Sequence, residues 1–330
     1  MKVLAIRFSA MGDVALLAAA AKAWLYNNPS GELIVCSRPI FQPLFEPLER
    51  CTFYGADVKK TYKGLLGMKM LADLLVNEFD FDHVADLHDV IRSRMLSTFL
   101  RFKGYPISRI KKGRAEKKKL TSRTKKQLLP LTHTVQRYLN ALPGQVQWRD
   151  EFLPIFQNRN INTPSNQETT IGIAPFAKHP TKQWPENRIV ELIHKLTHQG
   201  IRCLIFGTPE ERKHLLRHFS QNTLVESVPD TFSLKDEIKL IGQLRAFIAM
   251  DSFNMHLAAL CGVPVVSIWG PTHPYAGFSP LGSSQQHMVQ IDLECRPCSI
   301  YGNKPCYRDD HACMQGISVE RVYKEVLGVL

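Results

Sequence analysis

The feature that most constrains this chain is an alternation of short apolar runs and helix-forming segments that occurs twice. The short apolar runs have the length of buried strands. In the longer segments between them, the apolar residues have the spacing typical of a helix. The runs expected as strands are 2–8, 32–37, 82–88, 170–175, 201–207, 245–250 and 263–270. The segments expected as helices are 13–28, 68–79, 92–102, 131–142, 185–200, 209–219, 233–244, 252–262 and 318–330. This order predicts an α/β chain with parallel sheets wrapped by helices.

The alternation stops and restarts at a polar stretch, FQNRNINTPSNQETT (156–170), which is typical of a linker. A length of 330 residues suits two cores of about 150 residues each. We therefore expect two Rossmann-like domains in tandem, residues 1–160 and 161–330, with a cleft between them.

Composition indicates the compartment. No window holds 18 consecutive apolar residues, so no transmembrane helix is expected. Arg7 and Asp13 come too early for the apolar core of a signal peptide. These observations predict a cytoplasmic protein, whose eight cysteines are reduced thiols or metal ligands rather than disulfides.

The positive charge is concentrated in one segment. The chain has a net charge of +12, and residues 109–126 hold ten Lys and Arg with one Glu. Such a segment is typical of an exposed, mobile loop with an anionic partner, which is a nucleic acid, an acidic membrane or a phosphorylated glycolipid. A solvated loop with no specific partner is the alternative. Nucleic acid is disfavoured, because the segment has no interleaved aromatic residues and the chain has no known nucleic-acid-binding motif.

Polar residues follow the expected strands, where open α/β sheets bind their ligands. Asp13, directly after Gly12, begins a helix and is expected as a helix cap, which could also serve as a base that faces the cleft. Lys178, His179 and Lys182 precede a helix and form either a phosphate cradle or an ordinary loop anchored by Trp184.

Two more places follow strands of the second half. Glu210 and Glu211 begin a helix, and they either cap it or provide a carboxylate that binds a ribose or sugar hydroxyl. Asp251, Ser252 and His256 share the start of another helix, whose N–H groups can hold a diphosphate.

The last four cysteines form a cluster in the sequence. Cys295, Cys298, Cys306 and Cys313 have the spacing C-x2-C-x7-C-x6-C. This pattern predicts either a structural zinc site or a thiol-rich loop without metal, because the second pair is spaced more widely than is usual for zinc. Since the cluster follows the other motifs, we expect no catalytic role for it.

Four motifs in order resemble those of one family. RFSAMGDV (7–14), ADLHDVIRSRMLSTFL (85–100), KQWP (182–185) and DSFNMHLAALCGVPVVSIWGPTHP (251–274) are similar to motifs of the ADP-heptose:lipopolysaccharide heptosyltransferases, glycosyltransferase family 9. The resemblance implies a GT-B fold, with two Rossmann-like domains facing each other across a cleft. It also implies an inverting, metal-independent transferase that uses ADP-heptose and a lipopolysaccharide core acceptor at the inner membrane surface.

The resemblance also implies roles for residues. Asp13 would be the catalytic base, in an acceptor-side domain that carries the basic insert 109–126. The second domain would bind the nucleotide sugar and include the Cys-rich segment 295–313 and the terminal helix. The implied donor residues are Lys178, Lys182, Glu210, Asp251, Ser252, Phe253, His256 and Thr272. The acceptor-side residues are Ser9, Gly12, Lys111 and Lys112.

Two positions depart from the family pattern. Phe253 stands where the family has glycine, and His273 replaces the aspartate of its G-P-T-D-P motif. These departures leave another nucleotide-sugar donor, or an acceptor other than lipopolysaccharide, as the alternative. A family member that binds but does not catalyse is disfavoured, because Asp13 and Lys182 are retained.

Overall fold

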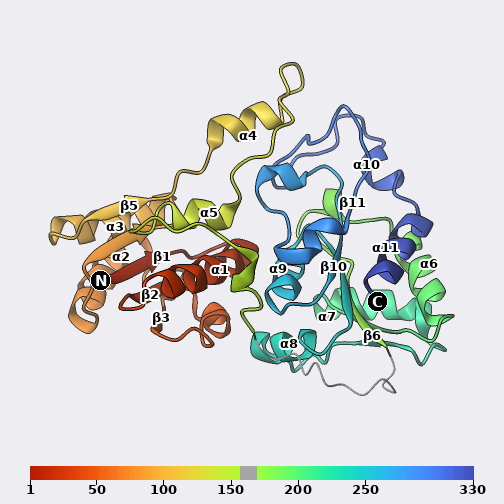
Figure 1. Ribbon diagram of the computed structural model, residues 1–330, viewed down its shortest axis with the longest axis horizontal. Coiled ribbons are helices and arrows are strands. Elements are labelled where there is room, and N and C mark those ends of the chain that lie inside the picture. Colours follow the sequence, from red (N-terminus) through yellow and green to blue (C-terminus); the bar gives the residue numbers. More distant parts are fainter. Residues whose placement is uncertain (157–168) are drawn as a thin grey trace. The chain divides into compact units, whose positions relative to one another are not determined.

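The computed structural model describes residues 1–156 and 169–330, which divide into two compact units (Figure 1). Unit 1 comprises residues 1–112 and 132–155, and unit 2 comprises 113–131 and 156–330. The boundary predicted at residue 160 and most of the predicted linker lie outside the described residues. The basic insert, which the sequence assigns to the first domain, is divided, because residues 113–131 group with unit 2.

Unit 1 is built on a five-stranded sheet in the order β3-β2-β1-β4-β5, and every paired strand is parallel to its neighbour. Its strands are β1 (Lys2–Ile6), β2 (Glu32–Ser37), β3 (Cys51–Gly55), β4 (His83–Asp86) and β5 (Ile107–Arg109). Its α-helices are α1 (Met11–Asn27), α2 (Gly64–Glu78), α3 (Ile91–Phe102) and α5 (Thr134–Leu139). Its short 3-10 helices are η1 (Pro39–Leu44) and η2 (Asp150–Phe152).

Apolar burial explains how these helices are arranged. Leu4 and Ile6 of β1 pack in one core with Met68 and Leu71 of α2 and Leu96 of α3. The helices α2 and α3 therefore cover one face of the sheet together, as their apolar stripes require. Burial of side chains of this size stabilises a fold by about 1.5–3 kcal/mol each.

Unit 2 contains a six-stranded parallel sheet in the order β11-β10-β9-β6-β7-β8. Its strands are β6 (Thr170–Ala174), β7 (Arg202–Ile205), β8 (Val225–Ser227), β9 (Ala246–Met250), β10 (Val265–Ile268) and β11 (Met288–Val289). Its α-helices are α4 (Arg114–Leu120), α6 (Glu186–Thr197), α7 (Pro209–Leu216), α8 (Leu234–Ile241), α9 (Phe253–Leu260), α10 (Ala312–Gln315) and α11 (Val319–Val329). Its 3-10 helices are η3 (Pro180–Lys182), η4 (Arg217–Phe219), η5 (Pro274–Ala276) and η6 (Gly282–Gln286).

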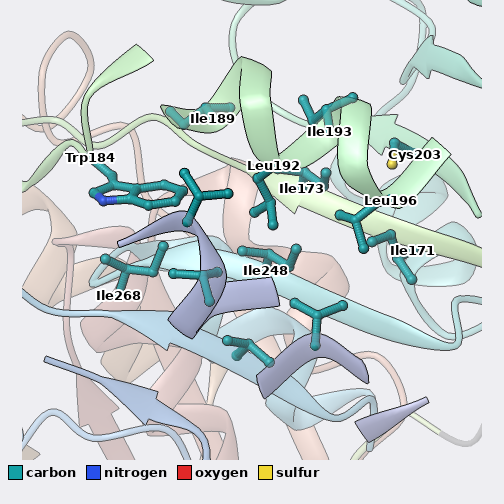
Figure 2. Close-up of a cluster of buried hydrophobic side chains, with 14 of the residues drawn as sticks. Ile171, Ile173, Trp184, Ile189, Leu192, Ile193, Leu196, Cys203, Ile248 and Ile268 are labelled. Carbon is teal, nitrogen blue, oxygen red and sulfur yellow. The ribbon is translucent and has the colours of Figure 1, made fainter. Parts of the chain in front are cut away.

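The core of unit 2 fixes the loop that follows β6. Figure 2 shows Trp184 beside Ile268 and close to the α6 side chains Ile189 and Leu192. The indole is buried, and its Nε1 donates a hydrogen bond to the carbonyl of Ile317 at 3.1 Å. The expectation that Trp184 packs on the core is therefore confirmed, and Lys182 lies only two residues from this anchor.

The predicted fold class is confirmed, since both halves are parallel α/β sheets. The sequence missed β3, β5, β8 and β11, because these strands have only two to five residues and most of those residues are not fully buried. Residues 38–48, which no expected strand or helix covers, contain the 3-10 helix η1. No helix in the described ranges is long and apolar enough to cross a membrane.

Candidate functional site

Each sheet has one place where the strand order reverses. In unit 1 the chain adds β2 and β3 on one side of β1, and β4 and β5 on the other. In unit 2 it adds β7 and β8 on one side of β6, and β9, β10 and β11 on the other. Ligands of open α/β sheets bind at such switch points, outside the carboxyl ends of the strands. The β1/β4 edge and the β6/β9 edge are therefore the two places to examine.

Asp13 lies at the β1/β4 edge, in the first turn of α1. Its Oδ2 is 2.8 Å from an amino nitrogen of Arg7 and accepts the backbone N–H of Ala10 at 3.3 Å. The expectation that Asp13 caps the helix is therefore confirmed. The side chain is 23% exposed, and Oδ1 accepts no hydrogen bond from the described residues. One carboxylate oxygen is thus fixed, and the other is available to a proton.

Arg7 is a site residue to which the sequence assigned no role, although it is the first letter of the RFSAMGDV motif. Its buried guanidinium donates to the carbonyl of Leu87 and lies 5.3 Å from the centre of the Tyr138 ring. Tyr138 in turn donates its hydroxyl hydrogen to the carbonyl of Asp13 at 3.2 Å. Because Arg7 is held from several sides, it determines the direction in which the Asp13 carboxylate points.

His88, directly after β4, was also missed as a site residue. Its Nδ1 accepts the backbone N–H of Phe8 at 3.4 Å, and its Nε2 lies 3.3 Å from the hydroxyl of Ser9. Burial lowers the pKa of His88 to about 3, and the charges of Arg7 and Lys112 act in the same direction. The ring is therefore neutral near pH 7, and Nε2 carries the hydrogen that it donates to Ser9.

The remaining predicted acceptor-side residues differ in their surroundings. Gly12 is the second residue of α1 and lies next to Asp13. Lys112 donates to the carbonyl of Asp89 at 3.0 Å and so joins the β1/β4 edge. The side chain of Lys111 is exposed, and no hydrogen bond ties it to this edge within the described residues.

An ion pair spans the β6/β9 edge of unit 2. The Nζ of Lys182, after β6, lies 3.1 Å from Oδ2 of Asp251, after β9, and both side chains are only 12% exposed. Asp251 thereby fixes the position of the Lys182 ammonium group at the switch point, where a phosphate would lie.

Two hydroxyl groups follow β9 and β10 of the same sheet. The Oγ of Ser252 and the Oγ1 of Thr272 are buried and have no hydrogen-bond partner among the described residues. Ser252 precedes α9 as its N-cap residue, yet its side chain accepts no capping bond. Leaving a hydroxyl buried and unpaired costs about 1–3 kcal/mol, a cost that a ligand with oxygen acceptors removes. His256, in the first turns of α9, is buried as well.

Three predicted donor residues lie at this end of unit 2 but outside the Lys182–Asp251 pair. Glu210 is exposed, and the cap of α7 is formed by Glu211, which accepts the N–H of Thr208 at 2.9 Å. The alternative that this pair of glutamates caps the helix is therefore correct, through Glu211 rather than Glu210. Lys178 is exposed with no polar partner within the described part of the chain. Phe253 is half-buried at the first position of α9, next to Ser252.

The Cys-rich segment (295–313) contacts this edge, although it follows the other motifs in the sequence. Gly302 has φ +75°, and a Cβ added there would lie 2.4 Å from Cγ of Lys182. Arg296 is buried and donates to the carbonyls of Gly270 and Thr272. The segment therefore supports both Lys182 and the loop that carries the Thr272 hydroxyl.

The four cysteines of this segment line one cavity together with Arg308, Asp310 and His311. All four are free thiols. The only group of three or more metal-ligating atoms within 4.8 Å of one another, among the described residues, is Glu186 with His214 and His218. The four sulfurs share a cavity but do not form a closed metal site.

The basic segment 109–126 is not the mobile loop that the sequence predicts. Residues 114–120 form α4, and the Nζ of Lys117 lies 4.6 Å from the centre of the Phe278 ring. Arg123 lies 4.0 Å from the centre of the Tyr307 ring. Lys126 donates to the carbonyls of Glu294 and Arg296 at 2.8 and 2.9 Å. This part of the segment is held on the Cys-rich segment because its cations contact aromatic rings and carbonyls there.

Two units, each built on a parallel sheet with polar residues at its switch point, place the chain in the class of two-domain α/β proteins. The profile of glycosyltransferase family 9 (heptosyltransferase) matches residues 72–305. Because this match covers more than half of the chain, the protein belongs to that family.

Known relatives agree with this assignment. Lipooligosaccharide heptosyltransferase 2 of Campylobacter jejuni is 28% identical over 211 residues, which cover 60% of this chain and 64% of the relative. Among solved structures, the E. coli heptosyltransferase WaaC with ADP aligns over all of both chains, with a TM-score of 0.71 and 18% identity. The dodecameric iron-containing heptosyltransferase TibC aligns over 99% of this chain and 76% of its own, with a TM-score of 0.56 and 14% identity. The structural matches confirm the GT-B fold.

Proposed function

We propose that this protein transfers heptose from ADP-heptose to a lipopolysaccharide core acceptor, with inversion and without a metal. The observation that carries the proposal is the β6/β9 edge of unit 2, where a buried lysine and two unpaired hydroxyls follow the neighbouring strands β6, β9 and β10. Such a site suits the diphosphate of a nucleotide sugar, because phosphate oxygens accept hydrogen bonds and attract the lysine charge. Family membership and the name of the Campylobacter relative support heptose as the sugar.

Each predicted residue receives a role in this proposal. Asp13 removes the proton from the acceptor hydroxyl, and Arg7 and His88 set the geometry around it. Ser9, Gly12, Lys111 and Lys112 lie on the acceptor side. The diphosphate contacts Lys182, Ser252, Thr272 and the start of α9 with His256, while Lys178 adds positive charge. Asp251 holds Lys182, Glu210 binds the ribose, and Phe253 shapes the sugar pocket.

A donor-binding experiment tests this function without an acceptor. Thermal-shift measurements across ADP-heptose, ADP-glucose, UDP-glucose, GDP-mannose and CMP-Kdo should show selective stabilisation by ADP-heptose. Selective stabilisation by another sugar nucleotide would instead support the second candidate, a GT-B transferase with a different donor, which Phe253 and His273 favour. The anomeric configuration of the product then tests inversion, and turnover in excess chelator tests independence from metal.

The acceptor and the location of the enzyme belong to the same proposal. A lipopolysaccharide core acceptor is an anionic glycolipid, so the enzyme would work in the cytoplasm and associate peripherally with the inner membrane. The exposed Lys111, Lys118 and Lys119 of the basic segment support contact with its phosphates, because they lie outside the contacts that hold Lys117, Arg123 and Lys126.

We also propose that the Cys-rich segment binds a structural zinc ion through Cys295, Cys298, Cys306 and Cys313. Four thiols around one cavity support this, since thiolates are preferred zinc ligands. Since no three of the four sulfurs lie within 4.8 Å of one another, zinc binding would bring them closer together. Elemental analysis of anaerobically purified protein should find one zinc per chain. Iron would correct the identity of the metal, and absence of both would remove the proposal.

A further inference from the structure

The outward face of α2 in unit 1 carries large apolar side chains. Leu65, Leu66 and Met70 are 58%, 76% and 57% exposed. Met68 and Leu71, on the opposite side of the same helix, are fully buried in the core. Single exposed apolar residues are ordinary, but three within two turns of one helix form a patch that indicates an interaction surface.

Positive charge surrounds this apolar patch. Lys59, Lys60 and Lys63 precede α2, Lys69 lies within it, and all four are exposed. No acidic residue occurs between Asp57 and Asp73. Asp73 is itself paired with two lysines, at 3.3 Å to Lys69 and 2.7 Å to Lys103. Asp57 accepts the backbone N–H groups of Lys59 and Lys60, so it orders the loop that carries them.

A glycine brings the lysines and the leucines together. Gly67 is buried, and a Cβ there would lie 2.3 Å from the backbone carbonyl carbon of Tyr62. Only glycine allows the loop to pack this closely on the first turn of α2. The hydroxyl of Tyr62 is hydrogen-bonded to that of Tyr54 at 2.7 Å, which fixes the loop further. Residues 59–70 therefore form one ordered surface, named here the α2 face.

The α2 face lies at the functional edge of its own sheet. Because all paired strands of unit 1 are parallel, the start of α2 after β3 lies at the same edge as Asp13 after β1 and His88 after β4. The start of α3 lies at this edge too, and its first residue, Ile91, is 80% exposed. Exposed apolar and basic groups therefore occur on the side of unit 1 that carries the proposed base.

We propose that the α2 face docks unit 1 on the surface of an anionic phospholipid bilayer. The leucines and Met70 enter the region between headgroups and acyl chains, and the lysines contact lipid phosphates. Charge complementarity selects this occupant, since basic groups around an apolar centre match an anionic lipid surface. The inference deepens the proposed function, because a membrane-anchored acceptor would then be presented at the edge that carries Asp13.

Vesicle binding by the full-length protein tests this proposal. Flotation with phosphatidylcholine vesicles that contain phosphatidylglycerol is compared with flotation on pure phosphatidylcholine. The wild type should bind the anionic vesicles more tightly, and added salt should weaken binding. Replacing Leu65 and Leu66 by Glu should weaken binding about tenfold or more, as should the joint change of Lys59, Lys60 and Lys63 to Gln.

Phe102→Glu is the matched control. Phe102 is 83% exposed and ends α3, so it lies at the opposite end of that helix from Ile91 and should leave vesicle binding unchanged. Equal binding by the leucine variant and the wild type, or no binding by the wild type, would overturn the proposal. Loss of self-association in the leucine variant with unchanged vesicle binding would also overturn it and identify a second copy as the occupant.

The donor thermal shift, measured on the same variants, separates this inference from the proposed function. It should be unchanged in all of them, because none of the altered residues lies in unit 2. Vesicle binding that persists in a protein that no sugar nucleotide stabilises would leave the docking surface intact and reject the transferase proposal.

Discussion

The β1/β4 edge and the β6/β9 edge occupy equivalent places in two similar sheets but differ in how their polar groups are satisfied. At the β1/β4 edge the side chains hold one another, with Arg7 on Asp13 and His88 on Ser9. At the β6/β9 edge the Lys182–Asp251 pair lies in the same unit as two buried hydroxyls without partners, Ser252 and Thr272. The first edge is preorganised to orient a base, whereas the second is completed only by a ligand.

The largest expected effect tests the role of the β1/β4 edge. Asp13→Ala should lower kcat about 10²–10⁴-fold, because a positioned general base contributes a factor of this size. The dissociation constant of the donor should remain within about twofold of wild type, as expected for a change confined to unit 1 and to a single proton acceptor. Steady-state kinetics and donor titration measure the two quantities separately.

Asp13→Asn is the sharper version of this test. The amide keeps an oxygen that can accept the N–H of Ala10 and pair with Arg7, but it cannot take a proton. Turnover near the wild-type rate in Asp13→Asn would show that Asp13 is only a helix cap. Thermal unfolding of both variants reveals any change in stability.

The next largest effect concerns the ion pair of unit 2. Lys182→Ala should weaken donor binding about 10–100-fold, since it removes a charge-assisted contact and leaves the Asp251 carboxylate to repel phosphate. Isothermal titration with the donor measures this. Lys178→Ala is the matched control from the same loop, and we expect a much smaller loss because Lys178 is exposed. Equal losses in both variants would mean that the loop acts only through its overall charge.

A smaller effect distinguishes ligand-binding hydroxyls from structural ones. Ser252→Ala and Thr272→Val should each weaken donor binding about 2–10-fold, while the stability of the unligated protein stays equal or rises, because an unsatisfied hydroxyl is removed. Ser233→Ala is the control, since Ser233 caps α8 by accepting the N–H of Asp236. It should lose about 1 kcal/mol of stability and leave the donor titration unchanged. Lower stability in Ser252→Ala without an effect on binding would contradict the comparison.

Most of the fold could be predicted from the sequence, because buried strands and amphipathic helices have distinct periodicities. The sequence also predicted that Lys182 and Asp251 each follow a strand. Because these two strands are neighbours in the sheet, the Nζ of Lys182 lies 3.1 Å from Oδ2 of Asp251. Periodicity carries no information about short, half-buried strands, so β3 was missed. The net charge of a segment does not show which aromatic rings it will contact elsewhere in the chain. The segment around Lys117 and Arg123 was therefore expected to be mobile, although rings more than 100 residues away hold it.

The partners of the site residues could not be predicted for the same reason. Arg7 stood in the quoted motif, but its pairing with Asp13 depends on how the turn after β1 folds back. The close approach of Gly302 to Lys182 joins residues 120 positions apart and leaves no local pattern. His88 belongs to the quoted ADLHDV stretch, yet only its burial beside Arg7 shows that the ring is neutral.

The last expected effect concerns stability rather than binding or turnover, and it is a pH dependence that His88 causes at the β1/β4 edge. Burial lowers the pKa of folded His88 to about 3, whereas an unfolded histidine titrates near 6.5. As pH falls below 6.5, His88 becomes protonated in the unfolded chain but stays neutral in the folded protein. The free energy of unfolding therefore falls with pH until His88 is also protonated in the folded protein, near pH 3. Between pH 6.5 and pH 5 this loss is about 1.5 kcal/mol.

Denaturant unfolding of the wild type and of His88→Gln at both pH values measures this effect. The free energy of unfolding should fall less between pH 6.5 and pH 5 in His88→Gln than in the wild type, by about 1.5 kcal/mol. His198→Gln, at an exposed histidine, is the control, and its free energy of unfolding should change between the two pH values as much as that of the wild type. If His88→Gln and the wild type lose equal stability, His88 is accessible to protons in the folded state, and the β1/β4 edge is more open than its hydrogen bonds indicate.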